Sequence, residues 1–129
     1  MEEEYRQLRA GWAAGDRDRK RALHLLYLSW WHWAEPEFLT GLSDDPSAVE
    51  LWHEIFAHLG GEASPDAEFL YVAGIMATVT PWALGDEVHW VAVGKSLKAR
   101  AQQLRPKGFS PDDFESQGDY GEYFAHQSR

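Results

Sequence analysis

The chain has no cysteine among its 129 residues. This absence excludes disulfide bonds and thiolate metal ligands, and it fits a reducing cytoplasm, which is the compartment we expect. The first four residues are acidic apart from the initial methionine, and no apolar run follows them at the distance typical of a secretory signal. We therefore expect no signal peptide.

Basic residues are missing from the middle of the chain. Residues 22–94 contain no lysine or arginine but eleven acidic residues, whereas the whole chain carries a net charge of −9. Nucleic-acid binding needs clustered cations, so this balance predicts no nucleic-acid partner. Solvated faces are the default account of this charge split, and the basic flanks, residues 6–21 and 95–107, could also pair with the acids across the fold. The sharper hypothesis is a basic protein partner, attracted by complementary potential.

Long apolar runs are also missing. Residues 69–85 are uncharged, but they include Gly74, Pro81 and Gly85. A membrane-spanning helix needs about 20 predominantly apolar residues. We interpret this stretch as a buried helix followed by its exit, and we expect no contact with a membrane.

No segment shows the alternating apolar and polar residues of a half-buried strand. Apolar residues instead recur at spacings of three and four, which predicts a single all-α domain over residues 1–129. We expect about five to seven helices, arranged as antiparallel hairpins in a bundle or short superhelix. The predicted helices cover residues 2–14, 17–34, 36–40, 46–59, 65–79 and 86–104, with a short one from residue 111.

Capping residues and prolines define these boundaries. Asp16 is the expected N-cap of the second helix, and a proline opens each of several later helices, among them those beginning at Pro65 and Pro111. Gly74 and Gly94 lie within apolar helical stripes, at a cost of about 1 kcal/mol each relative to alanine. We expect them to allow close approach of the helices over residues 65–79 and 86–104.

The same two helices carry large and small residues in a recognisable order, at Leu70, Ala73, Gly74, Ala77, Gly94, Ala101 and Pro106. In this respect residues 65–106 resemble a tetratricopeptide-type helical hairpin. The connection is longer than that repeat permits, and Lys98 stands near the place of an expected aromatic residue. The resemblance implies a TPR-like scaffold or binding role for the concave face.

The C-terminal residues 109–129 are rich in aromatic side chains, so we expect this tail to dock onto the helices. Gly118 and Gly121 are expected to divide it into two short pieces.

No catalytic signature is visible, because the chain lacks a nucleophile elbow, a phosphate-binding loop and a dinucleotide fingerprint. His53, Glu54 and His58 look like a metalloprotease helix motif, but the two histidines are five residues apart instead of four. Their side chains diverge by about 140° on a helix and cannot reach one zinc ion. Glu50-Leu51-Trp52-His53 is a single copy of a motif that di-metal bundles use twice. We predict no metal and no cofactor.

Residues 30–33 form an unusual aromatic cluster. Helical geometry directs Trp30 and Trp33 into the core and Trp31 and His32 toward the flank. Core packing is the default use of this cluster, and a partly exposed ledge for a ligand or partner is the alternative.

The sequence therefore predicts a non-catalytic protein-interaction module with an acidic central surface and a basic protein partner. The candidate binding residues are Trp31, His32, Glu50, His53 and Glu54. Two alternatives stay open. One is a metal-dependent or small-molecule enzyme that uses His53, Glu54, His58 or His89. The other is a ligand-binding helical bundle with a pocket lined by Trp30, Trp31 and Trp90.

Overall fold

The computed structural model describes residues 1–34, 45 and 47–129. Regular structure in these residues is entirely helical, which confirms the predicted all-α class. The chain folds as two compact units, Met1–His58 and Leu59–Arg129, and each is described by itself. The prediction of a single domain stays a prediction. The helix predicted over residues 36–40 lies outside the described residues.

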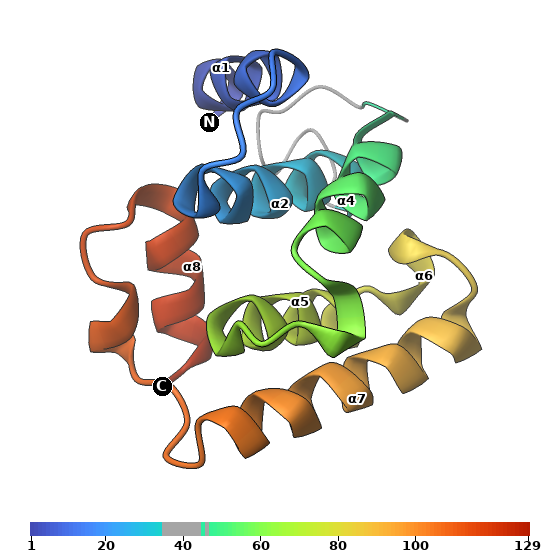
Figure 1. Ribbon diagram of the computed structural model, residues 1–129, viewed down its shortest axis with the longest axis vertical. Helices are drawn as coiled ribbons and strands as arrows, with labels where there is room; N and C mark the ends of the chain where they lie inside the picture. The colour runs from blue at the N-terminus through green and yellow to red at the C-terminus, as the bar shows by residue number, and fades with distance from the viewer. Residues whose placement is uncertain (35–44, 46) are drawn as a thin grey trace. The chain divides into compact units, whose positions relative to one another are not determined.

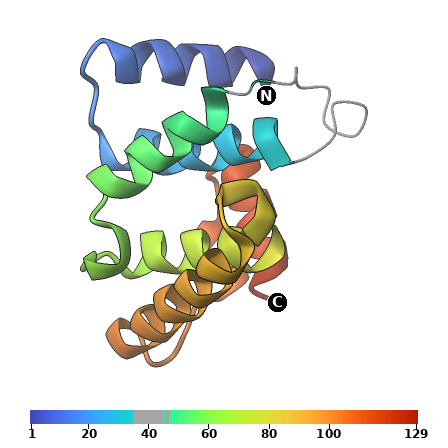
Figure 2. The ribbon, with the colours of Figure 1, turned by 90° about the vertical axis from the view of Figure 1, so that its right-hand side faces the viewer.

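The first unit contains α1 (Glu2–Ala13), α2 (Arg19–Ala34) and α4 (Ser47–His58). Helix α2 packs against both of the others, as Figure 2 shows. It is apolar around most of its circumference, because Leu25 and Leu28 are buried as well as Leu26 and Trp30. This wide apolar surface explains why α2 packs against two helices.

The predicted N-cap of α2 is wrong by two residues. The carboxylate of Asp16 accepts a hydrogen bond from the backbone N–H of Asp18 at 3.0 Å, which closes a turn before the helix. The carboxylate of Asp18 then accepts from the N–H of Arg21 at 3.0 Å. Asp18 therefore caps α2, and the helix begins at Arg19.

The second unit consists of four α-helices and two short 3-10 helices. In chain order these are η1 (Gly61–Ala63), α5 (Ala67–Val79), α6 (Pro81–Leu84), α7 (Glu87–Leu104), η2 (Pro111–Phe114) and α8 (Gly118–Gln127). Asp66 and Asp86 cap α5 and α7 by accepting hydrogen bonds from the backbone N–H groups of Phe69 and His89. The sequence analysis missed α6, because Pro81 ends one helix and also opens the next.

Helices α5 and α7 lie antiparallel and in extensive contact (Figure 1). A Cβ atom added to Gly94 would lie 3.2 Å from Cβ of Ala77, and one added to Gly74 would lie 2.9 Å from Cγ of Lys98. The two glycines therefore allow the close helix approach that the sequence predicts. None of the helices in the described part of the chain has the combination of length and hydropathy that crossing a membrane requires.

The C-terminal tail docks within the second unit, as predicted. Phe114, Tyr120 and Phe124 are buried, and the Tyr120 hydroxyl donates a hydrogen bond to Glu68 at 2.6 Å. The expected break at Gly121 is wrong, because this residue lies inside α8. A Cβ atom there would lie 2.3 Å from the backbone oxygen of Phe114, so the glycine is needed for close approach.

Candidate binding groove

The aromatic cluster on α2 differs from its predicted arrangement. His32 is only 3% exposed, stacks on the Tyr5 ring with centroids 3.8 Å apart, and lies 3.5 Å from a carboxylate oxygen of Glu2. Its expected position on an exposed ledge is therefore wrong, because α1 covers that side of α2. Trp31 is partly exposed and stacks on Tyr27 with ring centroids 5.6 Å apart.

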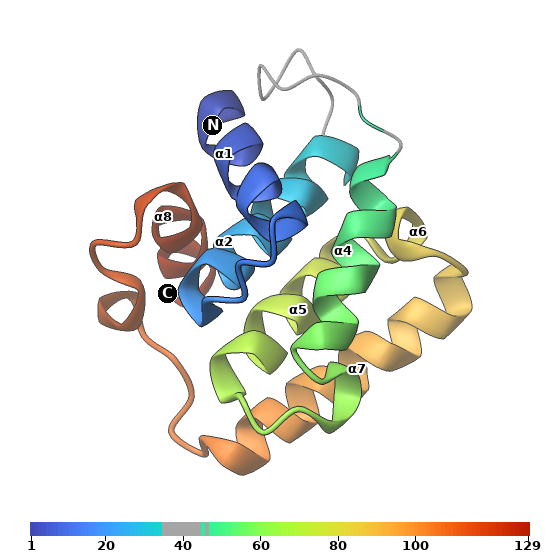
Figure 3. The same ribbon diagram turned by 45° about the horizontal axis from the view of Figure 1, so that its top comes forward.

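Two other predicted residues come together on α4. Glu50 and Glu54, one helical turn apart, line a hollow of ≈ 380 Å³ in the first unit, together with Arg9 and Arg17 (Figure 3 shows α1 and α4). Both glutamates are exposed, and neither forms an ion pair or hydrogen bond with another described residue. The Arg17 guanidinium lies over the Trp12 ring, 3.6 Å from its centroid.

Arg9, which also lines this hollow, belongs to a hydrogen-bond network that joins α1 to the start of α4. Arg9 donates hydrogen bonds to Tyr5, Asp45 and Ser47, and the Tyr5 hydroxyl donates to Asp45 at 3.0 Å. Burial raises the pKa of Tyr5 to about 12, with Arg9 opposing and Asp45 reinforcing the shift. Burial works against ionisation of Asp45, but hydrogen bonds from Ser47 and Tyr5 lower its pKa.

The histidines of the sequence analysis do not gather at one place within a unit. His53 lies edge-on to Trp52, and His58 lies edge-on to Trp12 with ring centroids 5.3 Å apart. His89 is exposed at the start of α7, in the other unit. Across the described residues, no group of three or more metal-binding side chains is arranged to hold a metal ion.

A different hollow lies in the second unit, beside the C-terminal half of α7. Its volume is ≈ 370 Å³, within the range of ligand-binding pockets. The side chains that line it include Tyr71, Lys98, Gln102, Arg105, Lys107 and Phe109. Tyr71 lies on α5. Lys98 and Gln102 lie on one side of α7, Arg105 directly follows the last residue of that helix, and Lys107 and Phe109 lie in the turn after it. The wall is mixed aromatic and cationic.

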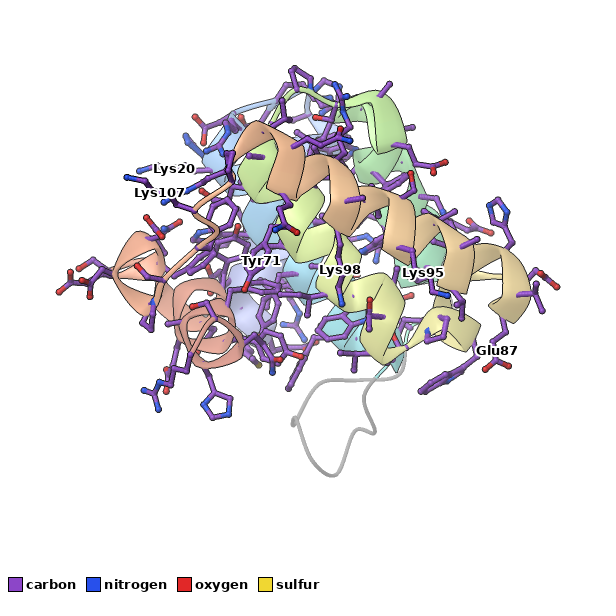
Figure 4. The ribbon with its side chains drawn as sticks, turned by 90° about the horizontal axis from the view of Figure 1, so that it is seen from below. Lys20, Tyr71, Glu87, Lys95, Lys98 and Lys107 are labelled. Atoms are coloured by element: carbon purple, nitrogen blue, oxygen red, sulfur yellow. The ribbon has the colours of Figure 1, made fainter. Side chains whose placement is uncertain are left out.

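This hollow continues along α5. A second hollow of ≈ 260 Å³ is lined by Ile75, Thr78 and Val79, and it shares Tyr71 and Lys98 with the first. The two hollows together are called the α5–α7 groove. Figure 4 shows Tyr71, Lys98 and Lys95 in a row along one side of α7.

Positive charge concentrates at this groove although the second unit is acidic overall. The unit contains ten acidic and six basic residues, a net charge of −4. Lys95, Lys98 and Lys107 form no ion pair with another described residue. Arg105, in contrast, donates to Asp113 at 2.7 Å and lies over the Phe109 ring. The backbone N–H of Ser110 and this arginine lower the pKa of the Asp113 carboxyl group.

Tyr71 supplies the aromatic wall of the groove. Its ring stacks on Phe109 with centroids 4.6 Å apart, and burial raises its pKa above the usual value. The hydroxyl therefore stays protonated beside Lys98 at neutral pH. It forms no hydrogen bond with another described residue, so it can donate one to a ligand.

Exposed apolar side chains lie on the helices next to the groove. Trp82 on α6 is 61% exposed, and Val88 and Val91 on α7 are 81% and 40% exposed. Val79, which lines the groove, is exposed as well. These four residues are called the apolar patch. Helix α6 packs against α7, and Val88 and Val91 share the face of α7 that also carries Lys95, Lys98 and Gln102.

The sequence analysis identified neither the groove nor the patch. In the sequence Lys95 and Lys98 lie away from the apolar stripe of their helix, and Trp82 belongs to the uncharged residues 69–85, interpreted as a buried helix and its exit. One signal for this surface is present in the sequence. A single helix face carries, at spacings of three and four, the residues Val88, Val91, Lys95, Lys98 and Gln102. Tyr71 is joined to that face only by the fold.

By fold and site, the chain is an all-helical protein of two compact units with an aromatic, cationic groove in the second. It matches no protein-family model, and no curated protein or solved structure matches it. The resemblance to a tetratricopeptide hairpin, the predicted binding residues and the two alternative functions therefore stay predictions.

Proposed function

We propose that the chain is a non-catalytic protein-interaction module, and that its second unit binds a polypeptide segment of a partner at the apolar patch and the adjoining α5–α7 groove. The observation that carries this proposal is the 61% exposure of Trp82 on α6, a helix that packs against α7, where Val88 and Val91 are exposed as well. Tryptophan is enriched among the residues that dominate binding energy in protein interfaces.

Large apolar side chains that are exposed to water lose the favourable free energy that their burial in an interface would provide. Burying a large aromatic side chain removes about 150 to 250 Å² from water, at roughly 25 cal/mol per Å² of apolar surface. Exposed apolar clusters with polar rims are typical of protein-interaction sites. Here Lys95 and Glu87 supply charged residues on α7, the helix that also carries Val88 and Val91 (Figure 4 labels the two charged residues).

The test compares two exposed apolar residues of the same unit. The purified chain, immobilised, is incubated with a lysate of the organism that encodes it, alongside Trp82→Ala and Leu104→Ala variants. Leu104 is 44% exposed on α7 but lines neither hollow, so it is the matched control. We expect one or more proteins to be retained by the wild type and the control and to be lost with Trp82→Ala.

The loss should correspond to about 2 kcal/mol or more, the usual cost of removing a dominant interface residue. A retained partner should also keep its intact mass after incubation with the chain, because the module is non-catalytic. Equal retention by all three proteins, or a covalently altered partner, would contradict the proposal.

The predicted basic partner is a separate proposal for the first unit. Its support there is limited to Glu50 and Glu54, which line the hollow on α4 and are not engaged by other described residues. A basic side chain placed in that hollow can pair with both carboxylates.

A further inference from the structure

The chemistry of the groove restricts the kind of partner that can fill it. This step rests on the proposed function, because it concerns the same site. We infer that the α5–α7 groove binds an acidic, amphipathic segment of a partner protein, with carboxylates facing Lys95, Lys98 and Lys107 and apolar side chains covering Phe109 and the apolar patch.

The first support is charge complementarity. Three lysines without an ion pair among the described residues lie at the groove or on the face of α7 that borders it. They do so in a unit of net charge −4, so the local sign is opposite to the average. An acidic partner segment offsets the mutual repulsion of the three lysines, and their positive potential raises the rate at which it associates.

The second support is the alternation of polar and apolar surface along the groove. At one end Lys107 and Lys98 stand beside the stacked rings of Tyr71 and Phe109. At the other end Lys95 stands on the same α7 face as Val88 and Val91. The Tyr71 hydroxyl adds a hydrogen-bond donor for a carboxylate. A ligand that is only anionic leaves the apolar surface exposed, and one that is only apolar leaves the lysines unpaired.

The third support is length. Val88 and Gln102 are separated by about 21 Å along the α7 axis at the usual rise of 1.5 Å per residue. A small anion spans only part of that face, whereas a helical segment of about 14 residues spans all of it. Docking of an amphipathic helix along a groove is a common mode of peptide recognition.

The probe is a fluorescein-labelled helical peptide of about 14 residues, with glutamates on one side and leucine and phenylalanine beside them. A matched peptide carries glutamine at every glutamate position. Fluorescence anisotropy is measured at about 50 and about 300 mM NaCl. We expect the acidic peptide to bind at least tenfold more tightly than the glutamine peptide at low salt, and the difference to narrow at high salt.

Two variants with the same change of charge identify the site. Lys98→Glu should weaken binding of the acidic peptide about tenfold or more. Lys20→Glu, in the first unit, should have little effect, because Lys20 is exposed and lies on α2 instead of the groove (Figure 4 labels both). Equal weakening by the two variants would indicate attraction to general charge and would overturn the inference.

Comparison of the Trp82→Ala and Lys98→Glu variants distinguishes a failure of the inference from a failure of the proposed function. If Trp82→Ala weakens peptide binding but Lys98→Glu does not, the apolar patch is used and the acidic partner is wrong. If only Lys98→Glu has an effect, the groove binds acidic segments and the role of the patch in the proposed function is wrong. Displacement of the peptide by inorganic phosphate at micromolar concentration, equal or tighter binding of a single-stranded oligonucleotide, or dimerisation of the chain abolished by Lys98→Glu would each overturn the inference.

Discussion

Tyr5 is a buried phenol whose hydroxyl lies between a cation and an anion. It accepts from Arg9 and donates to Asp45, and these contacts hold α1 to the start of α4. Asp45 also accepts hydrogen bonds from the backbone and the hydroxyl of Ser47. A single side chain of α1 therefore helps to fix the N-terminus of another helix.

The raised pKa of Tyr5 predicts a loss of stability in alkali. Because the folded state holds the phenolic proton more tightly than the unfolded state, this contribution is fully present below about pH 10 and is lost as the pH rises through about 12. The difference corresponds to about 2 to 3 kcal/mol. The free energy of unfolding is measured by urea denaturation from pH 8 to pH 11.5, because most of the loss of stability falls within this range.

The control for this prediction is Tyr5→Phe, which removes the titrating group and keeps the ring that stacks on His32. The variant should be less stable near neutral pH but should lose less stability than the wild type in alkali. Parallel alkaline decline in both proteins would show that other groups cause it.

At the scale of helices, the glycines of the second unit have different roles. Gly74 faces the flexible side chain of Lys98, whereas Gly121 faces the backbone oxygen of Phe114. Side-chain rotation can move Cγ of Lys98 away from an added Cβ, whereas the backbone oxygen of Phe114 can move only with its turn.

This contrast predicts losses of different size for two identical substitutions. Gly121→Ala should lower the free energy of unfolding by about 2 kcal/mol or more, because η2 and α8 must separate. Gly74→Ala should cost clearly less, because Lys98 can shift its side chain and alanine recovers up to about 1 kcal/mol of helix propensity. Chemical denaturation of the two variants and the wild type measures both values. A Gly74→Ala variant as unstable as Gly121→Ala would contradict this account of the α5–α7 contact.

Helix positions were largely predictable from the sequence, because apolar spacing and capping residues act locally. The helix α7 follows its N-cap Asp86 and ends just before Pro106, as expected. The errors arise where two local signals compete. Asp16 and Asp18 can each cap α2, and only the chain path after Gly15, with its φ of 103°, selects Asp18.

At the scale of the whole molecule, the net charge of −9 is shared almost equally by the two units, −5 in the first and −4 in the second, so the contrast between them lies in the charges at their hollows that stay unpaired among the described residues. Among the acids of residues 22–94, Asp66 and Asp86 cap helices, Asp45 binds Arg9, and Glu68 accepts from Tyr120. These carboxylates are used inside the fold, so the count of acids overstates the acidic surface. The cationic groove is not visible in the sequence because only the fold joins its parts: Lys95 and Lys98 belong to α7, Tyr71 belongs to α5, and Lys107 and Phe109 lie in the turn after α7.

Within the described part of the chain, the unpaired glutamates at the hollow of the first unit and the unpaired lysines at the groove of the second predict that peptides of opposite charge use different units. A lysine-rich peptide should bind the first unit, and Glu50→Gln combined with Glu54→Gln should weaken it severalfold, because both carboxylates line one hollow. The acidic peptide described above should be unaffected by these changes. Titration calorimetry with both peptides provides the measurement. The control is Glu122→Gln in the second unit, and equal weakening by this variant would mean that the lysine-rich peptide responds to net charge alone.

The exposure of Trp82 has an optical consequence. The chain has seven tryptophans, and Trp82 is the one that is largely in water, whereas Trp12, Trp30, Trp52 and Trp90 are buried and Trp31 and Trp33 are partly covered. Its indole should therefore contribute the long-wavelength edge of the emission spectrum and most of the quenching by acrylamide. Occupation of the apolar patch would shift that edge to the blue and protect it from the quencher, so the protein carries an intrinsic reporter of its own binding site.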